Sequence, residues 1–99
     1  MHITFVKKIL ASGEVCRKCR DVEERLHRAG YWARIDSVVI ADERDPESAG
    51  VKLAREHQAA SAPFFVVRNG ANVRIYTVFL QLVREVLNPP MPQPRTCVQ

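Results

Sequence analysis

The chain has 99 residues, of which 46% are hydrophobic and 26% are charged, and its formal net charge is +4. A chain of this length folds as one domain with one modest core, and no apolar run approaches the ~18 residues that a membrane span needs, so we expect a globular protein without a membrane partner. The excess of basic residues does not predict nucleic-acid binding, because charges of both signs alternate along one helix face and no basic run contains interleaved aromatic residues.

The N-terminal stretch from His2 to Leu10 is rich in β-favouring apolar residues and predicts a strand, which the loop Ala11–Glu14 ends. Lys7 and Lys8 follow the apolar residues instead of preceding them, and the small-residue cleavage site of a signal peptide is missing. We therefore expect a cytoplasmic protein.

The clearest amphipathic helix begins near Val15 and ends before Gly30, which stands where a helix C-cap is expected. Its apolar residues recur at spacings of three and four, as one face of a helix requires. They are Val15, Cys19, Val22, Leu26 and Ala29. Beyond this helix, the unbroken apolar run within Ile35–Ala41 predicts a strand that is covered on both faces of a sheet.

The segment Asp45–Glu47 predicts the start of a second helix, which runs to His57. It supplies an N-cap at Asp45, a proline at the first helical position and an acid near the positive end of the helix. Gly50 inside this helix costs about 1 kcal/mol relative to alanine. The helix is therefore expected, with a weak point at the glycine.

The runs Phe64–Val67 and Val73–Thr77 predict a β-hairpin with its turn at Asn69–Gly70. Phe64 and Phe65 point to opposite faces of their strand, so we expect one in the core and the other beside a groove near Cys16.

The helical spacing of apolar residues from Phe79 to Leu87 predicts a last helix, which ends at Asn88 before two prolines. The order of elements, β-α-β-α-β-β-α, predicts an α/β fold with a mixed four-stranded sheet and helices on both faces. This domain spans residues 1–88. Residues 89–99 hold four prolines and are expected to form a flexible tail.

Cys16 and Cys19 are three residues apart, so on a helix they lie about one turn apart and their sulfur atoms can meet in a disulfide. Cys19 falls on the apolar face and Cys16 on the polar side, so we expect one shielded and one exposed thiol. Dithiol exchange needs this asymmetry, because an accessible thiolate attacks a substrate disulfide and a second thiol resolves the mixed disulfide. We expect the helix N-terminus and the cations Arg17 and Lys18 to stabilise the Cys16 thiolate, as at sites where the pKa is lowered from ~8.5 to ~3.5–7.5.

Two other interpretations of the cysteine pair stay open. A C-x-x-C can be half of a zinc site, but no second C-x-x-C or H-x-x-x-H accompanies it, so we expect no bound metal. The two thiols could also be structural and unreactive. The third cysteine, Cys97, is expected to be a free thiol in the tail.

Four motifs follow one another along the chain: a C-x-x-C that opens a helix, a second helix start at Asp45–Glu47, a segment Ser61–Phe65 that leads into a strand, and an Asn-Gly turn. This ordered set resembles the thioredoxin and glutaredoxin superfamily over Ile3–Leu87. The resemblance implies a thioredoxin-like fold and a cis-proline at Pro63 beside the cysteine pair. It also implies that the backbone of Ala62 hydrogen-bonds a bound polypeptide or thiol.

We therefore expect a small thiol–disulfide oxidoreductase in which Cys16 attacks and Cys19 resolves, similar to the disulfide reductases of that superfamily. Its substrates would be protein disulfides or low-molecular-weight thiols, and a separate reductase would supply electrons. Its redox-active group would be the Cys16–Cys19 disulfide, with no other cofactor. Asp42 and Glu43 are the candidates for the buried acid that thioredoxins have. The alternative is a non-catalytic thioredoxin-like interaction or redox-sensing module.

Overall fold

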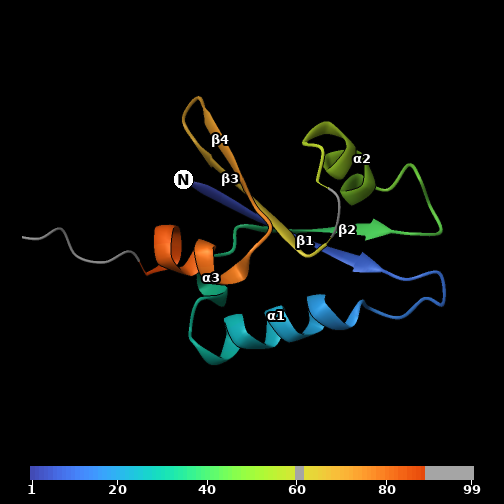
Figure 1. The fold of residues 1–99 in the computed structure, drawn as a ribbon, viewed down its shortest axis with the longest axis horizontal. Coiled ribbons are helices and arrows are strands. Elements are labelled where there is room, and N and C mark those ends of the chain that lie inside the picture. Colours follow the sequence, from blue (N-terminus) through green and yellow to red (C-terminus); the bar gives the residue numbers. More distant parts are fainter. Residues whose placement is uncertain (60–61, 89–99) are drawn as a thin grey trace, which may run out of the picture.

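The computed structural model describes residues 1–59 and 62–88, over which the chain forms four strands and three α-helices (Figure 1). The predicted tail and Cys97 lie outside the described residues. Within the described part, none of the helices has the length and apolar character needed to cross a lipid bilayer. In chain order the elements are β1 (His2–Ile9), α1 (Arg17–Arg28), the 3₁₀ turn η1 (Trp32–Arg34), β2 (Ser37–Asp42), α2 (Ala49–Glu56), β3 (Phe64–Asn69), β4 (Asn72–Tyr76), α3 (Phe79–Leu82) and the π-helical turn η2 (Val83–Leu87).

The strands form one mixed sheet in the order β2-β1-β3-β4. β1 pairs in parallel with β2 and antiparallel with β3, and β3 pairs antiparallel with β4. A parallel pair needs a crossover connection, and α1 lies within it. The predicted α/β class with a mixed four-stranded sheet is therefore confirmed.

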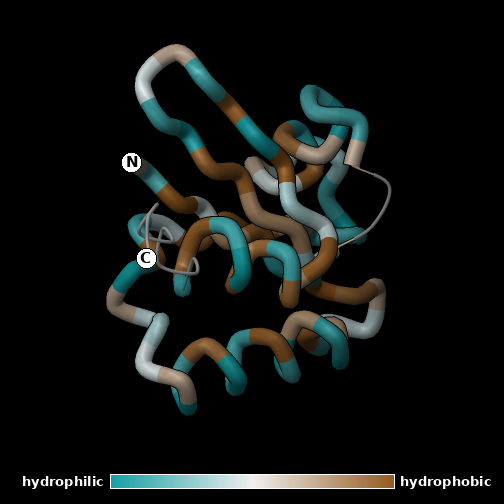
Figure 2. The backbone as a smooth tube through the Cα atoms, turned by 60° about the vertical axis from the view of Figure 1, so that its left-hand side comes forward, coloured by the Kyte–Doolittle hydropathy of each residue, from teal (hydrophilic) through white to brown (hydrophobic). Residues whose placement is uncertain are grey.

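The two faces of the sheet carry separate apolar cores, because alternate residues of each strand point to opposite faces. α1 and α3 cover one face and α2 covers the other (Figure 1). Figure 2 shows the alternation of polar and apolar residues along α1, the helix at the bottom of the view. Phe65 packs in the core on the α1 side, where its ring stacks on Phe5 at 5.0 Å, and Phe64 packs in the core on the α2 side. Both rings are buried, so the expectation that only one would lie in the core was wrong, but Phe65 also lines a groove beside Pro63.

α1 begins two residues later than the apolar pattern suggested. Val15 stands before the helix and forms a β-bridge with Ile9, so it continues the sheet instead of the helix face. The helix ends at Arg28, and Gly30 follows it with a φ of +79°, as a glycine after a helix C-terminus often does.

α2 begins at Ala49, later than predicted, with Ser48 at its N-cap. The carboxylate of Asp45 accepts a hydrogen bond from the backbone N–H of Glu47 at 2.9 Å and so closes a turn before the helix. The hydroxyl of Ser48 accepts a hydrogen bond from the backbone N–H of Asp42 at 3.0 Å, which ties the helix start to the end of β2. The predicted helix is present, but the residues predicted to start it, Asp45–Glu47, form a turn that precedes it.

Gly50 lies where α2 comes closest to β2. A Cβ atom added at this position would lie 2.4 Å from the backbone nitrogen of Ala41 and 2.5 Å from the carbonyl of Ile40. The glycine therefore allows a close approach of helix to strand, which explains why the helix retains a residue of low helical propensity.

β2 was expected to be covered on both faces, but it lies at the edge of the sheet and Val38 is 40% exposed. The hairpin turn also differs by one residue from its prediction. Asn69 pairs with Asn72, so the loop residues are Gly70 and Ala71, and Gly70 has a φ of +63°. A glycine with positive φ at the first loop position fits a two-residue hairpin turn.

Candidate active site

The cysteine pair stands where the loop after β1 returns to the sheet. Cys16 is the N-cap residue of α1, and its backbone N–H donates a hydrogen bond to the carbonyl of Lys8 at 2.9 Å. Its own carbonyl accepts the first helical hydrogen bond, from the N–H of Arg20 at 3.0 Å. Strand and helix together therefore fix the position of the two thiols.

The two thiols differ in exposure as the helical phase predicted. Cys19 is fully buried on the inner face of α1, whereas Cys16 is only half-buried, and both are free thiols. The backbone N–H of Lys8 donates a hydrogen bond to the Sγ of Cys19 at 3.3 Å. An outer thiol at the helix end thus lies one turn from an inner thiol that is held against β1.

The environment shifts the pKa values of the two thiols in opposite directions. Burial alone would raise the pKa of Cys16, but hydrogen bonds from the backbone N–H groups of Cys19 and Lys18, a contact with the Cys19 thiol and the charge of Lys8 outweigh it and lower the pKa. Burial raises the pKa of Cys19 to about 11, against the hydrogen bond from the Lys8 N–H, and a neighbouring thiolate on Cys16 raises it further. Of the two thiols, Cys16 is therefore the one that loses its proton more readily.

An ion pair that sequence reasoning missed lies beside the dithiol. The Nζ of Lys8 lies 2.8 Å from the Oε2 of Glu43, and the Oε1 of Glu43 accepts a hydrogen bond from the backbone N–H of Ala11 at 2.9 Å. The hydrogen bond to Glu43 raises the pKa of Lys8, and the hydrogen bond from Lys8 lowers the pKa of Glu43. Each group is thus held in its charged form. A signal for this pair exists in the sequence, since Lys8 and Glu43 each lie at the carboxyl end of one of two strands predicted to be parallel.

Of the two candidate acids, only Glu43 joins the site. Asp42 instead forms an ion pair with Arg44, whose guanidinium donates to it at 2.9 Å. The Arg44 side chain and backbone N–H lower the pKa of Asp42 to about 2. The side chain of Glu43 is 38% exposed, so it differs from the buried acid that the resemblance suggested.

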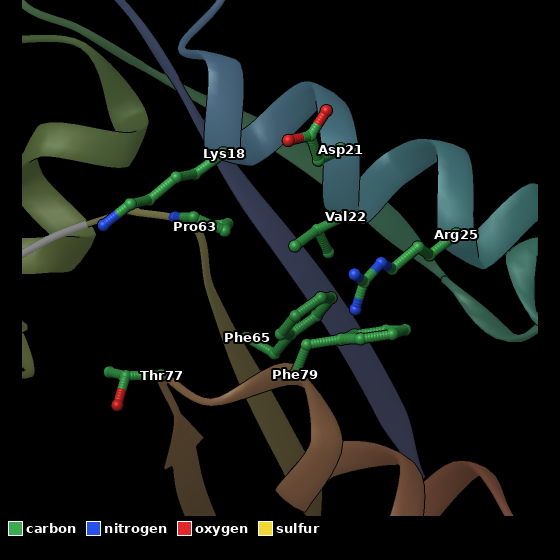
Figure 3. A pocket seen from close by; sticks show the side chains of 8 residues that line it. All are labelled: Lys18, Asp21, Val22, Arg25, Pro63, Phe65, Thr77 and Phe79. Atoms are coloured by element: carbon green, nitrogen blue, oxygen red, sulfur yellow. The ribbon is translucent and has the colours of Figure 1, made fainter.

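Arg17 and Lys18, the two residues between the cysteines, differ in how they relate to Cys16. Lys18 reaches Cys16 through its backbone N–H, while its side chain runs toward Pro63 (Figure 3). Arg17 is exposed at the first turn of α1. The cation whose charge contributes to the lower pKa of Cys16 is Lys8, and a role for the side-chain charges of Arg17 and Lys18 stays a prediction.

Ala62 and Pro63 lie just before β3, and the peptide bond between them is cis, as the resemblance implied. Both residues are half-buried. Pro63 lines a groove of about 260 Å³ between α1 and the start of α3 (Figure 3). The groove brings the proline and the helix that carries the cysteines to one place. Six of its lining residues are Lys18, Asp21, Arg25, Pro63, Phe65 and Phe79.

A metal site at the cysteine pair would need further ligands beside the two thiols. Within residues 1–59 and 62–88, no three His, Cys, Asp or Glu side chains lie close enough together to hold a metal ion. The positive charge of Lys8 acts on both thiols, and a charged lysine cannot ligate a metal.

Comparisons of the chain with protein-family models, with curated proteins and with solved structures found no match. The likeness to the thioredoxin and glutaredoxin superfamily thus rests on the motifs and their order. What the site can do chemically follows from its own residues, namely a thiol with a lowered pKa, a second thiol with a raised pKa one helical turn away and a lysine whose charge acts on both.

Proposed function

We propose that this protein is a thiol–disulfide oxidoreductase with a thioredoxin-like fold, which uses Cys16 and Cys19 as its reactive pair. The observation that carries the proposal is that two thiols one helical turn apart have pKa values shifted in opposite directions. A half-buried Cys16 has a lowered pKa, and a fully buried Cys19 has a pKa of about 11. Two structural thiols in a core would not need one partner to be accessible and activated.

In the first step the Cys16 thiolate attacks one sulfur of a substrate disulfide. The bond between Cys16 and that sulfur forms, the substrate S–S bond breaks, and the other substrate sulfur leaves as a thiolate. The hydrogen bonds that lower the pKa of Cys16 keep a larger share of it in the reactive form at neutral pH.

In the second step Cys19 resolves the mixed disulfide. Its proton passes to the thiolate that left first, and its sulfur attacks the Sγ of Cys16. The Cys16–Cys19 disulfide forms and the remaining substrate sulfur leaves as a thiolate, so the substrate has gained two electrons and the protein has lost two. Turnover then requires a separate dithiol donor or reductase to return the pair to its reduced state.

Lys8 supports both thiols from one position in β1. Its backbone holds Cys19 through the N–H and Cys16 through the carbonyl, and its ammonium favours a negative charge on either sulfur. The same ammonium is neutralised in part by Glu43, 2.8 Å away. We assign Lys8 as a positioning residue for the pair and Glu43 as the group that moderates its charge.

Ala62 and Pro63 are proposed to form the wall of the substrate site. Pro63 cannot donate a backbone hydrogen bond, and both residues precede β3 without belonging to it. The backbone of Ala62 is thereby available for a strand-like hydrogen bond to an extended polypeptide near the sulfur that Cys16 attacks.

A trapping experiment tests the proposal. The variant Cys19→Ser should accumulate a stable mixed disulfide on Cys16 when mixed with oxidised insulin or a small disulfide, and the wild type should reduce the same compounds with dithiothreitol as donor. The variant Cys16→Ser should do neither. If the wild type reduces no disulfide and Cys19→Ser traps nothing, the protein is a non-catalytic module with this fold.

A further inference from the structure

The groove beside Pro63 continues along the molecule between α1 and α3. A second hollow of about 320 Å³ shares Arg25 and Phe79 with the first one and extends to Tyr31 and Leu80. We call the two hollows together the α1–α3 groove. It begins next to Pro63 and Lys18, the residue that precedes Cys19 in the chain, although neither cysteine lines it.

The floor of the α1–α3 groove is apolar. Phe65 and Phe79 form its central part, with ring centroids 6.4 Å apart (Figure 3). Leu80 at its outer part is 64% exposed, although it follows a residue that packs against the core. Leu80 therefore offers apolar surface beside the hollow that a bound segment can bury.

The edge of the groove on α1 is basic. Lys18, Arg25 and Arg28 line it, against one acid, Asp21. Arg28 is paired with Glu24, whereas no carboxylate of residues 1–59 and 62–88 lies within salt-bridge distance of Lys18 or Arg25. Figure 3 shows the Arg25 side chain extending over the groove toward Phe79. Two cations that pair with no carboxylate of the described residues thus lie at the edge of an apolar floor.

We propose that the α1–α3 groove binds an acidic, apolar segment of the polypeptide that carries the substrate disulfide. The proposal rests on the proposed function and names its substrate class. Apolar side chains of the segment fill the hollows over Phe79 and Leu80, and its carboxylates pair with Arg25 and Lys18. The segment then leads to Pro63, where its disulfide meets Cys16. The net charge of +4 favours the approach of such an acidic chain.

Binding is tested with two cysteine-free peptides of equal length, one of Leu and Glu and one of Leu and Lys, on the Cys16→Ser/Cys19→Ser protein. We expect the acidic peptide to bind about tenfold more tightly, and Arg25→Glu to abolish that preference. Leu80→Ser should weaken both peptides. Arg68→Glu is the matched control, because it makes the same charge change at the far end of β3, outside the groove.

A second experiment measures kcat/KM for the reduction of a disulfide carried by either peptide. In the wild-type protein kcat/KM should be about tenfold higher for the acidic peptide, Arg25→Glu should remove this difference, and the control Arg68→Glu should keep it. Equal affinity for the two peptides, or an equal loss in Arg68→Glu, overturns the groove proposal even if both are reduced. Preferential binding without any reduction overturns the proposed function and leaves the groove as a docking site.

Discussion

The backbone N–H of Lys8 donates a hydrogen bond to the Sγ of Cys19 over 3.3 Å, while the side chain of the same lysine forms an ion pair with Glu43. One residue of the central strand β1 therefore positions the buried thiol with its backbone and sets the charge near both thiols with its side chain. The reactivity of the two thiols is expected to depend on this residue and on the opposite shifts of their pKa values.

The two cysteines should differ strongly in their reaction with iodoacetamide. At pH 8 in the reduced protein, Cys16 should be alkylated at least about a hundredfold faster than Cys19, because Cys19 is buried with a pKa of about 11 and only thiolates react. Mass spectrometry of peptides after timed quenching measures both rates. Equal rates would contradict the assignment of Cys16 as the nucleophile.

Replacing Lys8 by glutamine should slow attack by Cys16. The substitution keeps the backbone hydrogen bonds and removes the ammonium, so the pKa of Cys16 should rise and its reaction rate at pH 7 should fall about threefold to tenfold. The matched control is Lys7→Gln, the neighbouring lysine, whose ion pair is with Glu23. The rate is measured with a chromogenic disulfide. A similar loss in both variants would show that position 8 has no special role.

Replacing Glu43 by glutamine should have the opposite effect. The amide oxygen can still accept the hydrogen bond from Ala11, but the charge of Lys8 is no longer neutralised, so the pKa values of Cys16 and Cys19 should both fall below those of the wild type. Absorbance of the thiolate at 240 nm as a function of pH measures the shift. A rise in either value would contradict the moderating role of Glu43.

The reduced protein should become less stable as the pH rises from about 9 to about 11. In the folded state Cys19 has a pKa of about 11, above the ordinary thiol value of 9.0, so over this range the folded state holds more protons than the unfolded state. Stability therefore decreases with pH through this group. Urea unfolding at several pH values should show a steeper decrease for the wild type than for Cys19→Ser. Parallel curves for the two proteins would refute the raised pKa.

Gly50→Ala should destabilise the fold although alanine is the better helix former. Its Cβ would lie 2.4 Å from the backbone of Ala41, so α2 must move away from β2, at a cost of about 1–3 kcal/mol. Lys52→Ala, at an exposed position of the same helix, should change the free energy of unfolding by less than about 0.5 kcal/mol. Urea unfolding measures the free energy of unfolding of both variants. A stabilised Gly50→Ala variant would show that the close approach of helix and strand is not needed.

The order of strands and helices and the different exposure of Cys16 and Cys19 could be predicted from the sequence. Both depend on periodicity along one segment, and the apolar face of α1 is complete within its own residues. The mixed sheet also followed, because a strand–helix–strand unit favours a parallel pair and a short turn requires an antiparallel one.

The tertiary structure decided which groups surround the thiols. The pairing of Lys8 with Glu43 depends on the register of β1 and β2, in which Lys8 stands opposite Ala41. The sequence pattern within either strand does not predict this register. The late start of α2 depends on the hydrogen bond between Ser48 and the end of β2, and the α1–α3 groove depends on how two distant helices share one face of the sheet. Contacts between residues far apart in the chain are fixed only when the elements pack, so the sequence determined the dithiol and its polarity, and the packing determined its charge and its surroundings.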